Sequence, residues 1–81
     1  MNRFEQARLG RCDFLDVLEE SVLMRAEVRV ELADGTSFHD RLTDVETTGG
    51  RDRATFARHD PVLVEAIAVI ERDPLPHTYP T

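Results

Sequence analysis

The residues of this chain best suited to chemistry lie close together, in the stretch RCDFLDVLEES over positions 11–21. The stretch holds one thiol and four carboxylates: Cys12, Asp13, Asp16, Glu19 and Glu20. Three kinds of chemistry are conceivable for such a group. It could supply a thiolate nucleophile, an acid–base or calcium site, or a charged surface that meets a partner.

A reactive thiol is the least favoured of the three. Cys12 is the only cysteine of the chain, so no second thiol can resolve an oxidised form. Asp13 and Asp16 also oppose the formation of a thiolate so close to them. We therefore expect Cys12 to be a small, partly buried packing residue at the start of a helix.

Metal binding and catalysis also lack their usual patterns. The carboxylates do not follow the alternating ligands and central glycine of a calcium loop, and one helical face spreads them too widely for a coupled acid–base pair. His39, His59 and His77 stand at no metal-ligand spacing, and Ser21 lies in no nucleophile elbow. We expect no catalytic residue, metal site or cofactor, and hence a protein that is not an enzyme.

The carboxylates belong to a predicted helix that begins near Asp13, which can serve as its N-cap. Leu15, Leu18 and Val22 recur at helical spacing on one face and predict the side that packs against the core. The opposite face carries the acidic stripe, with Glu19 at its border. This stripe is either a solvated face or a docking surface.

Short strands are predicted after the helix. Alternation of apolar and charged residues over 24–32 indicates a half-buried strand. Asp34 and Gly35 then predict a tight hairpin turn in which both central positions take positive φ. The next strand, over 36–45, places Asp40 on the inward side, so we expect a bulge or strong bend near it.

The rest of the chain completes a small sheet. A third strand is expected over 51–58, a turn over 59–61, and over 62–71 a strand, with a bend into two short strands as the alternative. The fold class is therefore mainly β (α+β): an antiparallel barrel of four or five strands, SH3-like or Sm-like, with an N-terminal helix.

The size and charge of the chain narrow its possible partners. With 81 residues it is expected to form one domain over 12–71, between a flexible lead-in over 1–11 and a proline-rich flexible tail over 72–81. The single cysteine and the lack of a long apolar run favour a cytoplasmic protein with no membrane contact. The net charge of −6 repels nucleic acid, so no direct contact with nucleic acid is expected.

The acidic stretch carries a family likeness. CDFLDVLE over 12–19 resembles the cysteine–aspartate–x–x–aspartate–x–leucine–glutamate signature of the Rho-binding antiterminators, the Rof (YaeO) family. VELADG over 30–35 looks like the first strand and turn of that family, and Asp44 falls where the family has an aspartate. VEAIAVI over 64–70 is similar to its closing strand.

The resemblance implies an Sm-like barrel and a non-enzymatic regulator of transcription. Such a protein binds the hexameric termination factor Rho, blocks RNA access to its primary binding sites and inhibits Rho-dependent termination. The likeness assigns the contact to Asp13, Asp16 and Glu19, and helix geometry adds Glu20. We expect the chain to act as a monomer.

A second interpretation follows from the barrel alone. An Sm-like module can bind RNA or associate with copies of itself, although a fold carries little information about function. Its basic contacts would then be Arg25, Arg29, Arg51 and Arg53.

Overall fold

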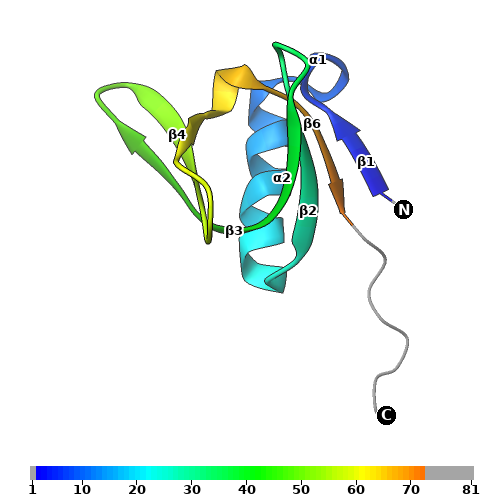
Figure 1. The fold of residues 1–81 in the computed structure, drawn as a ribbon. Coiled ribbons are helices and arrows are strands. Elements are labelled where there is room, and N and C mark those ends of the chain that lie inside the picture. Colours follow the sequence, from blue (N-terminus) through cyan, green and yellow to red (C-terminus); the bar gives the residue numbers. More distant parts are fainter. Residues whose placement is uncertain (1, 73–81) are drawn as a thin grey trace.

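The chain folds as one antiparallel sheet of six strands with two helices (Figure 1). The computed structural model describes residues 2–72. The elements, in chain order, are β1 (Asn2–Glu5), α1 (Gln6–Leu9), α2 (Arg11–Met24), β2 (Glu27–Leu32), β3 (Ser37–Thr48), β4 (Arg51–Phe56), β5 (Val62–Leu63), a 3₁₀ segment (Val64–Ala66) and β6 (Ile67–Arg72).

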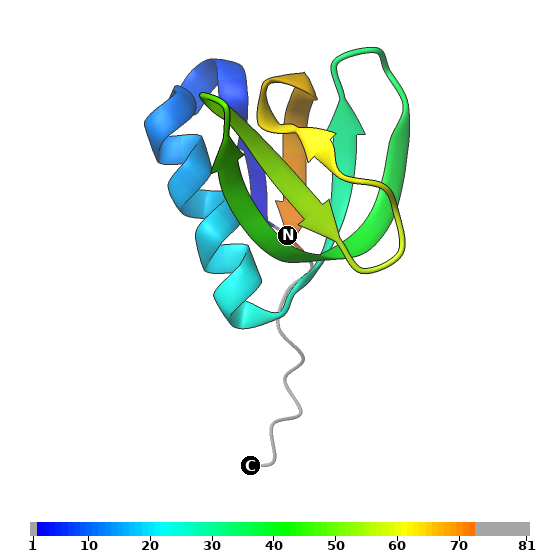
Figure 2. The same ribbon diagram turned by 90° about the vertical axis from the view of Figure 1, so that its left-hand side faces the viewer.

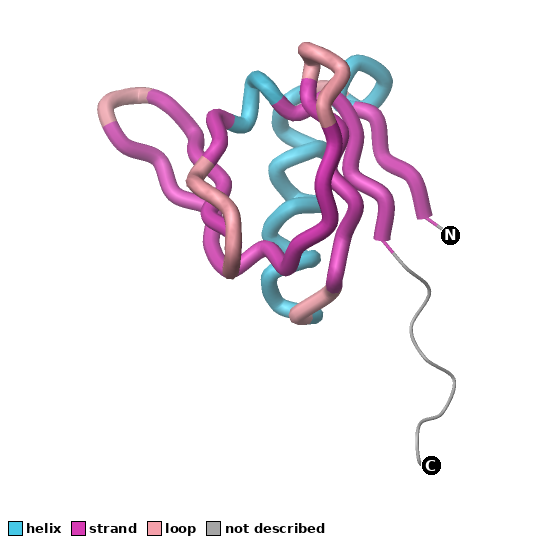
Figure 3. Tube along the Cα trace, in the orientation of Figure 1, coloured by secondary structure: helices cyan, strands magenta, loops and turns pink. Residues whose placement is uncertain are grey.

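The strands are hydrogen-bonded in the order β1-β6-β2-β3-β4-β5. β3 pairs with β2 along its first half and with β4 along its second, and the register shifts between Leu42 and Asp44. The sheet bends strongly along β3, so that the β3–β4 hairpin projects away from the other strands (Figures 1 and 3). The predicted mainly-β, antiparallel class is confirmed, with six strands instead of four or five.

The core lies between α2 and the bent sheet, as Figure 2 shows from the side. α2 contributes the buried side chains of Phe14, Leu18 and Ser21, and Leu15 and Val22 flank them. The Ser21 hydroxyl donates to the Val17 carbonyl at 2.8 Å, so this buried polar group is satisfied. The sheet and the 3₁₀ segment supply the remaining core residues: Val28, Val30, Leu42, Ala54, Phe56, Val64, Ile67 and Ile70.

The acidic helix begins earlier than the sequence predicts. α2 starts at Arg11, and Gly10 stands at its N-cap with a φ of 88°, which a glycine adopts without strain. Asp13 therefore lies in the first turn and does not cap the helix, although its charge there still favours the helix dipole. The helix ends at Met24, and Arg25 closes it in the left-handed region with a φ of 52°.

The β2–β3 turn lies where the sequence predicts it, but with a different geometry. The Gly35 amide donates to the Leu32 carbonyl at 3.0 Å, and Gly35 takes a φ of 94°. Asp34 does not take a positive φ, contrary to expectation. Its Oδ1 instead accepts hydrogen bonds from the amide and the hydroxyl of Thr36, which lower the pKa of Asp34.

The expected flexible lead-in over 1–11 is wrong for residues 2–9, which form β1 and α1. Arg3 pairs with Glu71 of β6 at 2.9 Å, and the Arg72 guanidinium lies 4.8 Å from the centre of the Phe4 ring. The side-chain amide of Gln6 donates to the carbonyl of Val64 at 3.0 Å and to the carbonyl of Ile67 at 2.7 Å. These contacts come from the far end of the chain, so local sequence does not reveal them.

The segment over 62–71 is not one straight strand but bends into two, the alternative given for it in the sequence analysis. β5, the 3₁₀ segment and β6 replace a single strand over 62–71. Arg72 ends β6 and is buried, so the predicted tail does not begin there. The rest of that tail, including His77, lies outside the described residues.

Asp40 is a fully buried carboxylate in β3. The register shift falls after it, between Leu42 and Asp44, so the bend leaves Asp40 pointing inward. Its Oδ2 accepts from the amides of Arg58 and His59, both at 2.9 Å, and lies 2.7 Å from Nδ1 of His59. Asp40 thereby fastens the loop between β4 and β5 to β3.

The hydrogen bonds to Asp40 decide its charge state. Burial alone raises the pKa of this carboxyl, but the hydrogen bonds from the His59 ring and from the amides of Arg41, Arg58 and His59 outweigh burial. Together they lower the pKa from 3.8 to about 2. Asp40 is therefore ionised at neutral pH, and the loop amides bond to a full negative charge.

Replacing Asp40 by alanine leaves the loop amides without their acceptor. We expect Asp40→Ala to lower the free energy of unfolding by about 3 kcal/mol, measured by urea denaturation at pH 7. Asp60→Ala is the matched control, because Asp60 is exposed in the same loop. An equal loss of stability in both variants would contradict this role for Asp40.

The same carboxylate predicts a defined dependence on pH. Because its folded pKa is depressed, its stabilisation is full above about pH 5 and is lost as pH falls from about 4 to about 2. The gap in unfolding free energy between the wild type and Asp40→Ala should therefore shrink across that window. Urea denaturation at four pH values between about 5 and 2 measures it, and a gap that stays constant to the lowest pH contradicts the assignment.

Candidate functional site

The exposed face of α2 is the candidate functional site. Asp13, Asp16, Glu19 and Glu20 are all exposed. Within residues 2–72, Asp13, Asp16 and Glu19 form no ion pair. These three carboxylates therefore offer uncompensated negative charge to an incoming partner.

Carboxylates on the sheet are held differently. Glu71 lies between Arg3 at 2.9 Å and Arg29 at 3.1 Å, and the hydrogen bonds from these two arginines lower its pKa. Asp52 accepts hydrogen bonds from the Thr47 hydroxyl and from Arg11, and both lower its pKa. The negative charge of these residues is largely compensated within the chain.

Glu20 differs from its neighbours on the helix. Its carboxylate lies 2.9 Å from Nη1 of Arg72, whose side chain is only 8% exposed. Burying a guanidinium without a counter-charge is costly, so Glu20 has a structural task at this position. The structure thus links Glu20 to β6 through an ion pair. Of the four residues predicted to contact a partner, Asp13, Asp16 and Glu19 are the ones without an ion pair in residues 2–72.

Glu19 lies on the other flank of α2, beside β3. A groove of about 310 Å³ separates the two elements there. It is lined by Glu19, Val22, Leu23, Asp44 and Val45. Asp44 was singled out in the sequence only through the family likeness, and the structure places it in the lining of the same groove as Glu19.

Leu23 is the residue of this surface that sequence reasoning missed. It is 83% exposed, although it is a large apolar side chain. At about 100° per residue, Leu23 falls opposite the buried Leu18 and Ser21, on the crest of the acidic face. An apolar residue on the polar side of a helical wheel was the available signal.

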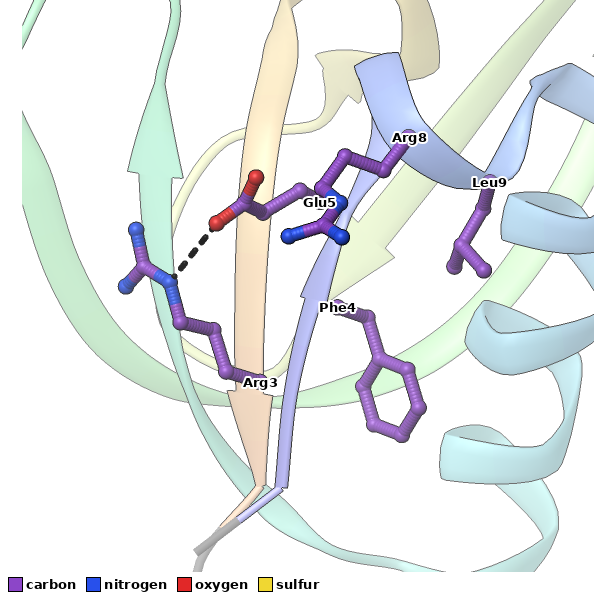
Figure 4. Close-up of a pocket in the computed structure, with 5 residues that line it drawn as sticks. All are labelled: Arg3, Phe4, Glu5, Arg8 and Leu9. Atoms are coloured by element: carbon purple, nitrogen blue, oxygen red, sulfur yellow. Dashed lines mark hydrogen bonds and ion pairs between the residues drawn. The ribbon is translucent and has the colours of Figure 1, made fainter.

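A second pocket, of about 240 Å³, lies beside β1 (Figure 4). It is lined by Arg3, Phe4, Glu5, Arg8 and Leu9. Arg3 and Glu5 neutralise each other at 3.1 Å, and the Phe4 ring points toward α2. This lining offers neither a nucleophile nor a set of metal ligands.

Cys12 is exposed, which corrects the expectation of a partly buried packing residue. The helix begins at Arg11, and Cys12 lies about 200° around it from the buried Phe14, on the outer side of the first turn.

Among the described residues no group of three or more His, Cys, Asp or Glu side chains could hold a metal ion. His39 is exposed, and His59 is engaged with Asp40.

The arginines proposed for an RNA-binding module come from three elements. Arg25 follows α2, Arg29 lies in β2, and Arg51 and Arg53 lie in β4. Arg29 is held by Glu71 at 3.1 Å and by Glu31 at 3.5 Å. Only Arg51 and Arg53 share an element, and Arg29 is engaged by carboxylates of the chain itself.

Over the described residues, no helix has the length and apolar character needed to cross a membrane. No protein-family model, curated protein or solved structure matches the chain.

Proposed function

We propose that this chain is a non-enzymatic regulator that binds the termination factor Rho through the exposed acidic face of α2. In doing so it keeps RNA off the primary binding sites of Rho and inhibits termination. The observation that carries the proposal is the free state of Asp13, Asp16 and Glu19, which occupy the acidic positions of the antiterminator signature. Glu20 contributes less, because it also serves Arg72.

Electrostatics explains how such a surface would work. A site that binds RNA is positively charged, and an acidic protein surface competes for the same charges. The carboxylates stand on a helix that Phe14 and Leu18 anchor in the core, so their spacing is fixed before binding. A chain with a net charge of −6 would also approach a basic site faster than a neutral one.

The proposal includes an Sm-like barrel and a monomer. It is supported by a helix followed by a strongly bent antiparallel sheet, and by the 3₁₀ link between β5 and β6. The two edge strands of the sheet, β1 and β5, have four and two residues, and edges this short offer a second copy little to pair with. Self-association and RNA binding are therefore less well supported than Rho binding.

Charge reversal on the helix tests the proposal. We expect Asp13→Lys/Asp16→Lys to weaken binding to purified Rho by about 2 kcal/mol, or roughly thirty-fold in Kd, because two exposed pairs are lost. Fluorescence anisotropy at low and high salt measures this, and high salt should weaken the wild type more than the variant.

The matched control changes the same charge elsewhere. Asp60→Lys/Glu65→Lys alters two exposed carboxylates outside α2 and should bind Rho nearly as the wild type does. No binding by the wild type, or equal weakening in both double variants, refutes the proposal. A complex between the chain and single-stranded RNA in a gel shift would favour the RNA-binding alternative.

A further inference from the structure

We infer that the groove between α2 and β3 seats one arginine or lysine side chain of a protein partner, with Leu23 as the apolar contact beside it. This inference rests on the proposed function, since it describes how the partner would be gripped. The groove extends beyond the signature helix, because two of its five lining residues, Asp44 and Val45, come from β3.

Two carboxylates from different elements define the charged part of the groove. Glu19 stands on α2 and has no ion pair among the described residues, and Asp44 stands on β3 just past the register shift. One oxygen of Asp44 accepts from the Val45 amide at 2.8 Å. The other accepts no hydrogen bond from residues 2–72, so the groove offers several acceptors to a cation with many N–H donors.

The apolar part of the groove suits the stem of the same side chain. Val22 and Val45 are half-buried and pack against the core, while Leu23 extends into solvent. Arginine and lysine lay their methylene stems on apolar surface and keep the charged end near acceptors. The groove, of about 310 Å³, has room for one such side chain.

Other occupants fit less well. The carboxylates repel the phosphates of a nucleic acid. A second copy of this chain also carries a net charge of −6 and is repelled. No group of three metal ligands is present in residues 2–72. A basic segment of a protein is the occupant whose charge and shape both match.

The groove is also preformed. Val22 and Val45 are fixed by the core on either side of it, and β3 is held in place by pairing with β4. A partner side chain therefore meets a site that needs little reorganisation, which lowers the entropic cost of binding.

The first experiment tests the groove without Rho. A tetra-arginine peptide blocked at both ends is titrated into methyl-labelled protein and followed by NMR. We expect shifts concentrated at Val22, Leu23 and Val45, and an apparent Kd about ten-fold weaker in Glu19→Gln/Asp44→Asn. Asp60→Asn/Glu65→Gln removes the same charge elsewhere and should bind as the wild type does.

The outcomes of this titration are decisive for the groove. Shifts spread evenly over the acidic surface, or equal weakening in the two double variants, overturn the inference. Methyl shifts at Leu23 that depend on protein concentration without peptide assign the groove to a second copy and overturn it as well.

The second experiment separates the groove from the proposed function. Leu23→Ser should weaken Rho binding about ten-fold without loss of stability, since this side chain is already 83% exposed. If the wild type binds Rho and both Leu23→Ser and Glu19→Gln/Asp44→Asn bind equally well, the groove inference fails and the proposed function survives. If the wild type does not bind Rho but the peptide seats in the groove, the proposed function fails. The inference that the groove binds a basic side chain then survives.

Discussion

Asp40 joins parts of the chain that the sheet alone does not hold together. Its buried carboxylate accepts hydrogen bonds from the loop between β4 and β5, and so fixes that loop against the first half of β3. The bend of β3 lies just beyond Asp40 in the chain, between Leu42 and Asp44. That bend turns the second half of β3 toward α2 and creates the groove beside Glu19. The buried charge of Asp40 and the groove thus lie on opposite sides of one register shift in β3.

The distribution of carboxylates separates structural from available charge. On the sheet, Glu71 and Asp52 bond to arginines and threonine, and Glu20 secures the buried Arg72. On the outer face of α2, Asp13 and Asp16 have no ion pair in the described part of the chain. Part of the negative charge of this protein therefore stabilises its own packing, while Asp13, Asp16 and Glu19 keep their charge free on one helix face.

Local signals were enough to predict many of the elements. The hairpin at Gly35, the third strand and the two-part closing segment all follow from turn residues and alternation within a few positions. Cys12 was misjudged because it was expected to precede the helix, whereas it lies inside the first turn and on the side away from Phe14. β1, the Glu20–Arg72 pair and the approach of Glu19 to Asp44 depend on contacts across the fold, which no local pattern encodes.

The pairing of β1 with β6 also has a consequence for the order in which the molecule is built. Asn2 lies opposite Arg72. β1, the first strand of the sheet in chain order, therefore pairs with β6, the last one (Figure 1). During synthesis, residues 2–5 emerge first but find no strand to pair with until β6 has been made. The hairpin core can form in the meantime, because β2, β3 and β4 are neighbours in sequence. Of these six strands, β1 is made before the others but cannot pair until β6 has been made.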